Sequence, residues 1–188
     1  MLQLHVIIIS TRPGRAGLPV ADWFVAQATR HAKFAVEVID LAKVGLPLFD
    51  EPRHPRLRQY QHEHTKAWSR TIDRADAFVF VTPEYNYGAP PSLVNALDFL
   101  VHEWAYKPVA FVSYGGVSGG TRSVQMAKQI VTALKMMPMF EAVVLPFFAQ
   151  LIDKETGVFA PPKIQEDAAV TMLDELLKWA TALKVMRP

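Results

Sequence analysis

Residues Thr82 to Asp98 hold the densest group of side chains that could do chemistry. The segment reads Thr-Pro-Glu-Tyr-Asn-Tyr-Gly-Ala-Pro-Pro before a helical pattern begins. Tyrosine rings offer flat faces, while an amide and backbone N–H groups can bond the polar edge of a ring. Binding residues often occupy such loops, although the same composition also suits a surface turn that covers the end of a sheet. The segment therefore indicates a site for a flat, polar-edged aromatic ligand, with a plain turn as the alternative.

The neighbours of this loop place it at the end of a strand. The run Ala75–Val81 is apolar, aromatic and β-branched, as expected of a buried parallel strand, and apolar residues at helical spacing follow between Ser92 and Val101. Pro90 and Pro91 suit the entrance of that helix, where a missing N–H costs nothing. The loop thus lies at the carboxyl end of a strand, where open α/β sheets bind ligands.

A second loop, residues 10–19, has the parts of a phosphate site. It offers hydroxyl groups, arginines, glycines that allow close approach, and the N-terminus of the helix that follows. The residues expected to bind the phosphate group and its surroundings are Ser10, Arg12, Arg15, Gly17, Leu18, Pro19 and Val20. An ordinary β–α turn with solvated arginines is the alternative.

This second loop lacks the dinucleotide fingerprint G-x-G-x-x-G, because its glycines are too few and differently placed. Asp40 ends the second predicted strand, where a dinucleotide-binding protein would have the acidic side chain that binds the ribose. Without the fingerprint, we interpret Asp40 as a helix cap or a loop anchor. The pattern favours a mononucleotide over a permanently bound dinucleotide.

The third loop is Ser113–Arg122, which contains four glycines. Closely spaced glycines let consecutive amides point at one ligand edge, although a flexible turn capped by Thr121 would use the same residues. The three loops follow the first, third and fourth predicted strands. In the order 2-1-3-4-5 these strands are neighbours, so one ligand could span all three loops.

Together, these motifs resemble the NADPH-dependent FMN reductase family. Its pattern T-P-E-Y-N-x-x-x-P-x-x-L-x-N-A-x-D is present from Thr82 to Asp98, and its phosphate loop and S-x-G-G segment match at residues 10–17 and 113–116. The resemblance implies an enzyme that passes hydride from NADPH through bound FMN to a small electron acceptor such as a flavin, quinone, azo compound or metal oxyanion. It implies contacts to the ring and ribityl chain from Pro83, Glu84, Tyr85 and Asn86, and to the pyrimidine edge from Ser113, Gly115, Gly116 and Ser118. It also implies a homodimer or homotetramer.

The chain alternates predicted strands and helices from end to end, which indicates an α/β fold. We expect strands at residues 4–9, 35–41, 78–81, 109–114 and 141–147, and helices at 18–32, 57–74, 93–102, 121–136 and 164–185. Near-continuous apolar strands indicate a parallel sheet with helices on both faces. The prediction is a flavodoxin-like three-layer sandwich, with residues 1–188 forming one domain.

Composition excludes several classes of function. The net charge of +2 comes without a clustered basic stripe, so we expect no nucleic-acid partner, and the absence of cysteine excludes disulfides and thiolate sites. No metal site is indicated, since His62 and His64 lack the spacing of a zinc motif. The apolar N-terminus reads as a strand and no segment reads as a membrane span, so we expect a soluble, cytoplasmic protein.

Three further segments have less specific patterns. The loop 47–60, with Arg53, Arg56 and Arg58, suits a solvated surface loop, a lid, an oligomer contact or a patch for the NADPH phosphate. Aromatic residues at 102–106 suit packing between subunits, and the closing helix suits core cover.

Two other functions are compatible with the sequence. One is an electron carrier like flavodoxin, and the other is a nucleotide-sensing module that binds FMN or NADPH without turnover.

Overall fold

A parallel sheet of five strands forms the centre of the computed structural model, which describes residues 1–187. The strands are β1 (Leu2–Ile8), β2 (Phe34–Asp40), β3 (Ala77–Pro83), β4 (Pro108–Tyr114) and β5 (Met137–Leu145). Their order is β2-β1-β3-β4-β5, and every neighbouring pair is parallel. The predicted flavodoxin-like order is confirmed.

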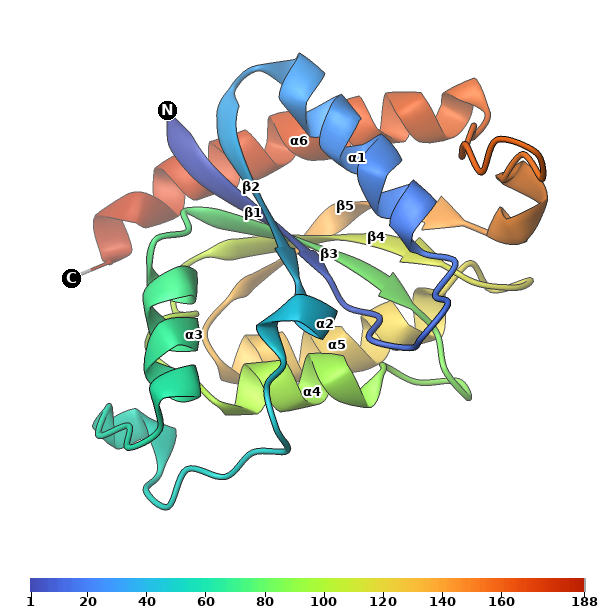
Figure 1. Cartoon of the computed structure of the whole chain (residues 1–188). Coiled ribbons are helices and arrows are strands. Elements are labelled where there is room, and N and C mark those ends of the chain that lie inside the picture. The colour runs from blue at the N-terminus through green and yellow to red at the C-terminus, as the bar shows by residue number, and fades with distance from the viewer. Residues whose placement is uncertain (188) are drawn as a thin grey trace.

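Helices cover both faces of the sheet and complete three layers (Figure 1). One face carries α1 (Leu18–His31) and α6 (Lys163–Leu183), and the other carries α3 (Glu63–Asp73), α4 (Pro91–Asp98) and α5 (Thr121–Ala133). Shorter turns of helix are α2 (Leu41–Val44), η1 (Pro55–Leu57), η2 (Phe148–Leu151) and η3 (Lys184–Met186).

The strand side chains alternate between two hydrophobic cores, one on each face. In β3, Val79 and Val81 pack with α1 and α6, whereas Phe78 and Phe80 pack with α3, α4 and α5. All residues of β3 and β4 are buried. Their apolar runs are therefore those of strands covered on both sides, and the strand ends with their loops are left to carry polar chemistry.

Two helices have an end that lies four or more residues from the predicted one. The helix expected from residue 57 begins at Glu63, because the buried carboxylate of Glu51 accepts hydrogen bonds from the backbone N–H groups of Gln61 (2.9 Å) and His62 (3.0 Å). These bonds hold the preceding segment in a non-helical path. The helix expected to reach residue 102 ends at Asp98.

Trp104 packs inside its own subunit and not between subunits. It is 1% exposed, lies against Trp68, Phe78 and Phe80, and donates its indole N–H to the carbonyl of Leu97 (3.3 Å). The expectation of intersubunit packing is therefore wrong for this residue.

The helix α5 is not capped by Thr121. Its N-cap is Gly120, which has a φ of +84°, and the Thr121 hydroxyl donates to the carbonyl of Ser118 (3.0 Å). The left-handed backbone needed at this cap explains the glycine.

The closing helix α6 covers the core, as expected. Its buried residues are Ala169, Met172, Leu173, Leu176 and Ala180.

The apolar run near the amino terminus forms β1, as predicted. Within residues 1–187, no helix combines the length and apolar character that crossing a membrane requires.

Candidate active site

A cavity of about 400 Å³ opens at the carboxyl ends of β1, β3 and β4. All three loops singled out in the sequence contribute to its wall, and a fourth segment after β5 joins them. The lining residues are Ser10, Arg12, Arg15, Ala16, Pro83, Glu84, Tyr85, Tyr114, Gly115, Gly116, Phe147, Phe148, Ala149 and Gln150. The sheet topology thus brings together three loops that are far apart in the sequence.

The two arginines of the first loop have different surroundings. Arg12 is exposed at the cavity wall, whereas the guanidinium of Arg15 pairs with the carboxylate of Asp40 at 2.5 Å. The other carboxylate oxygen of Asp40 accepts the N–H of Ala42 and caps α2. Asp40 is therefore both a helix cap and a loop anchor, as interpreted from the sequence. Arg12 has no acidic partner among residues 1–187, and it is therefore the better placed of the two arginines for a phosphate group.

Gly17 lies directly against the side chain of Tyr114. A Cβ atom at position 17 would stand 1.9 Å from the Tyr114 hydroxyl oxygen. Tyr114 is buried at the end of β4, and its ring also packs against Phe148, with centroids 4.7 Å apart. Burial raises the pKa of Tyr114, a neighbouring Tyr85 adds to the effect, and the hydroxyl therefore stays protonated at neutral pH. It is a neutral donor at the cavity wall.

The start of α1 adds backbone groups more than side chains. Gly17 is the N-cap, so Leu18, Pro19 and Val20 are the first three helical residues. Val20 is fully buried in the core and Leu18 is exposed, and neither lines the cavity. Any contact from these positions would come from the backbone N–H groups of Leu18 and Val20, because proline has none.

A hydroxyl pair joins the first loop to the second. The Ser10 hydroxyl lies 2.8 Å from the hydroxyl of Tyr85, and either group can donate. Ser10 is buried and Tyr85 is partly buried, and both line the cavity. Together with Tyr114, they give this wall three hydroxyl groups.

Glu84 ties the second loop to the third. Its carboxylate accepts hydrogen bonds from the Ser118 hydroxyl (2.9 Å), the Arg122 Nε (2.6 Å) and the Arg122 backbone N–H (3.2 Å). Burial alone would raise the pKa of Glu84, but these hydrogen bonds and the charge of Arg122 outweigh it and lower that pKa. Glu84 and Ser118, both predicted to contact a cofactor, are thus bonded to each other.

Asn86 lies at the tip of a tight turn, outside the cavity wall. Tyr85 and Gly88 exchange two backbone hydrogen bonds, of 3.0 and 2.9 Å, around Asn86 and Tyr87. Both central residues have positive φ, +48° and +68°, as in the primed turns of hairpins. Asn86 is exposed and does not line the cavity.

Gly115 and Gly116 of the third loop border the cavity, whereas Ser113 is not among its lining residues. The N–H of Gly115 donates to the carbonyl of Leu145 (3.3 Å), and a Cβ at Gly116 would meet no atom within 4 Å. Ser113 is fully buried, and its hydroxyl has no hydrogen-bond partner among residues 1–187. Pro83, at the end of β3, is buried and lines the cavity directly.

Sequence reasoning missed Tyr114 and the segment 147–150. Phe147 and Phe148 follow β5 as the other loops follow their strands, and Phe147 has a φ of +49°. Its backbone N–H donates to the carbonyl of Gly116 (3.0 Å), so this segment is attached to the third loop. The rule that ligands bind at the carboxyl ends of parallel strands would have pointed to it, because Phe147 ends the fifth predicted strand and Phe148 follows it. The strand itself spans Met137–Leu145 instead of the predicted 141–147.

A family model described as NADPH-dependent FMN reductase matches residues 2–150. That range includes every loop of the cavity. The chain belongs to the NADPH-dependent FMN reductase family. The family recognised in the sequence motifs is thereby confirmed, and with it an FMN-dependent NAD(P)H oxidoreductase.

Named relatives agree with this family. The chain is 44% identical over 148 residues to an NAD(P)H-dependent FMN reductase of Schizosaccharomyces pombe, covering 77% of this chain and 74% of the relative. It is 38% identical over 145 residues to a quinone reductase of Escherichia coli, covering 73% of each.

Solved structures share the fold. The flavoenzyme NAD(P)H:(acceptor) oxidoreductase FerB of Paracoccus denitrificans superposes with a TM-score of 0.72 at 20% identity, over 97% of this chain and 98% of that one.

The cavity suits the flavin mononucleotide that this family uses. The exposed Arg12 and the start of α1 provide positive charge and N–H donors for a phosphate group. The hydroxyl groups of Ser10, Tyr85 and Tyr114 offer hydrogen bonds to a polyol, and the open side of Gly116 leaves room for a flat ring. The volume of about 400 Å³ falls within the range of roughly 300–1,000 Å³ that small-molecule sites occupy.

Proposed function

We propose that the cavity binds FMN across the three loops and that the bound flavin passes hydride from NADPH to a small acceptor, of which a quinone is our first choice. The observation that supports this proposal is the convergence of the three family motifs on one cavity wall. In it, Arg12, Ser10 and the first N–H groups of α1 bind the phosphate group. Gly115 and Gly116 border the ring.

When bound, FMN supplies the hydride chemistry, and the chain supplies position and electrostatics. Pro83 and Tyr85 form one side of the cavity, and Phe148 and Ala149 belong to the segment that completes it. Backbone N–H groups near Gly115 would stabilise negative charge on the pyrimidine edge. Glu84 holds the second and third loops together through Ser118 and Arg122, so that both sides of the cavity keep their spacing.

The choice of a small acceptor is supported by the mouth of the cavity. Phe147 is 51% exposed there and Arg12 is also exposed, so the cavity reaches solvent beside an aromatic ring and a positive charge. A planar quinone matches both features, since it carries an apolar ring and polar oxygens. A quinone reductase and several quinone oxidoreductases are also among the relatives.

Two measurements test the proposal. Flavin-stripped protein is titrated with FMN while flavin fluorescence is followed, and saturable quenching near one FMN per chain is expected. The loaded protein is then given NADPH with and without a quinone, and sustained NADPH oxidation that depends on the quinone is expected. Absence of quenching would overturn the cofactor site. Quenching without NADPH oxidation would mean that the protein binds FMN as an electron carrier or as a sensing module and is not a reductase.

The domain organisation, cellular location and oligomeric state also follow from the family resemblance. We infer from the family resemblance that the whole chain acts as one domain, in the cytoplasm, as a homodimer or homotetramer. Sedimentation of the FMN-loaded protein at several concentrations tests the assembly, and a monomer at all of them would overturn it.

A further inference from the structure

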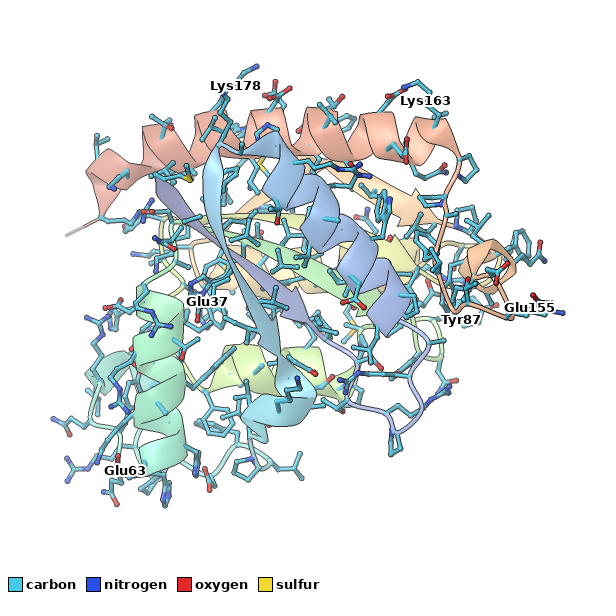
Figure 2. The ribbon with its side chains drawn as sticks, turned by 45° about the horizontal axis from the view of Figure 1, so that its top comes forward. Glu37, Glu63, Tyr87, Glu155, Lys163 and Lys178 are labelled. Atoms are coloured by element: carbon cyan, nitrogen blue, oxygen red, sulfur yellow. The ribbon has the colours of Figure 1, made fainter. Side chains whose placement is uncertain are left out.

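Arg122 and Tyr87 form an exposed pair at the rim of the cavity. The guanidinium carbon of Arg122 lies 3.7 Å from the centroid of the Tyr87 ring. The edge of the same guanidinium is bound by Glu84, with 2.6 Å from both Nε and Nη2 to one carboxylate oxygen. Because Glu84 also lines the cavity, this pair stands directly beside it. Figure 2 shows Tyr87 at the end of the molecule where α1 begins.

The backbone at Tyr87 is strained for an exposed residue. Its φ of +68° occurs in a turn that usually has glycine at this position, and a bulky side chain makes the left-handed region costly. The side chain is nevertheless 73% exposed, so burial of the ring does not compensate. Such outliers gather at functional sites, where the surrounding structure enforces them. Here the turn presents a flat aromatic ring to solvent.

Arg122 keeps part of its binding capacity free for a ligand. Its side chain is 41% exposed although one edge is held by Glu84 and one face by Tyr87. Held on two sides, the side chain loses little further freedom when it binds an anion. Val117 and Met126 add exposed apolar surface on the same loop and helix. The rim thus offers a fixed positive charge, an aromatic face and apolar surface.

We propose that this rim binds the adenosine 2′-phosphate part of NADPH and thereby selects NADPH over NADH. The inference rests on the proposed function and names the residues of the cofactor specificity. Arg122 pairs with the 2′-phosphate, because its guanidinium can donate to two phosphate oxygens. Tyr87 provides the aromatic surface beside the adenine. NADH lacks only the phosphate, so it gains nothing from Arg122.

The test compares two ligands that differ in the 2′-phosphate. Adenosine 2′,5′-bisphosphate and ADP are titrated calorimetrically into the FMN-loaded protein and into its Arg122→Gln variant. The variant is expected to lose about tenfold or more in affinity for the 2′,5′-bisphosphate, as for loss of a charge-assisted hydrogen bond, and less than about twofold for ADP. Arg70→Gln, which removes an exposed arginine on α3, is the matched control and should change neither.

Kinetics give an independent readout. In Arg122→Gln, kcat/KM for NADPH should fall by about tenfold while kcat/KM for NADH stays within about twofold. Arg122→Lys keeps the charge without the planar fork, and it should retain part of the preference. Equal losses for both nucleotides, or unchanged affinity for the 2′,5′-bisphosphate, would overturn the assignment.

An FMN titration of the same variant separates this inference from the proposed function. FMN affinity in Arg122→Gln should fall far less than affinity for the 2′,5′-bisphosphate, because the Ser118 hydroxyl still bonds to Glu84 and links the two loops. A parallel loss of FMN and bisphosphate affinity would overturn the inference, because it would mean that Arg122 acts only by holding Glu84. If the natural chain itself binds no FMN, the proposed function fails, whereas the same calorimetry on the flavin-free protein still reports on the 2′-phosphate.

Discussion

The hydroxyl of Tyr114 occupies the space that a side chain at position 17 would need. A Cβ at Gly17 would lie 1.9 Å from the hydroxyl oxygen and 2.4 Å from the ring carbon that bears it. Gly17 begins α1 and Tyr114 ends β4, so this contact fixes the distance between the first and third loops of the cavity. The glycine is required by a tyrosine 97 positions away, as well as by any approach of a phosphate group.

Gly17→Ala should therefore destabilise the protein and weaken FMN binding together. The methyl group can be accepted only if the buried Tyr114 ring moves, and overpacking of this kind costs roughly 1–3 kcal/mol. Urea unfolding of the FMN-free protein measures the first effect and flavin fluorescence the second. An alanine variant as stable as the natural chain would contradict the close contact.

Gly116→Ala is the matched comparison. A Cβ at this position meets no atom within 4 Å, so the stability of the FMN-free protein should change little. The new methyl group borders the cavity, however, and FMN affinity should fall. The alanine variant of Gly17 should thus lose both stability and FMN affinity, whereas that of Gly116 should lose FMN affinity alone. If both variants lost stability to the same extent, one of the two assignments would be wrong.

Arg12→Ala should weaken FMN binding by about 1.5–3 kcal/mol if its bond to the phosphate group is charge-assisted. Riboflavin lacks the phosphate, so its affinity should change far less than that of FMN. Fluorescence titrations with both flavins measure this difference, with Arg70→Ala as the control for loss of a surface charge. Unchanged FMN affinity would exclude Arg12 from the phosphate site.

Glu84→Gln should loosen the link between the second and third loops. Burial opposes the charge of Glu84, but the hydrogen bonds from Arg122 and Ser118 lower its pKa below the ordinary 4.5. A carboxylate with a lowered pKa in the folded state stabilises the protein above about pH 4.5, and this stabilisation is lost as the pH falls further. Thermal unfolding between pH 3 and 7 should show a lower melting temperature at pH 7 for the variant. The gap should narrow in acid, and a constant gap would argue against the ionised link.

We predict a second loss of stability, caused by His5, that begins at a higher pH than the loss caused by Glu84. It is fully buried, and burial lowers its pKa from 6.5 to about 4 although Glu37, 3.1 Å away, acts in the opposite direction. In the unfolded chain the His5 imidazole is protonated as the pH falls below about 6.5, whereas in the folded chain it is protonated only near pH 4. Stability should therefore fall as the pH drops from about 6.5 towards 4, by up to about 3 kcal/mol.

Replacing the buried imidazole tests this slope. Urea unfolding of His5→Leu should depend less on pH between 6.5 and 4 than that of the natural chain. His54→Gln, at an exposed histidine, should keep the natural slope. If His5→Leu also keeps it, other groups are responsible for the loss.

The sequence by itself determined the sheet and the places where its loops meet. Apolar strands that alternate with amphipathic helices leave few arrangements for a parallel sheet, and polar residues at the strand ends then fall on one edge. For this reason the order β2-β1-β3-β4-β5 and the three cavity loops were predictable, and Asp40 could be interpreted as an anchor. Family membership followed from the same motifs.

Only the tertiary structure decided what each polar group contacts. Periodicity reports which face of an element a residue occupies but not its partners across the sheet, so the pairing of Arg15 with Asp40 and of Glu84 with Arg122 could not be read from the pattern. The segment 147–150 joins the cavity because β5 lies beside β4, a contact between strands and not a local signal. Likewise, Trp104 is buried against Trp68 by the packing of α3 on the sheet. Such contacts depend on three-dimensional distances, which a single sequence specifies only through the complete fold.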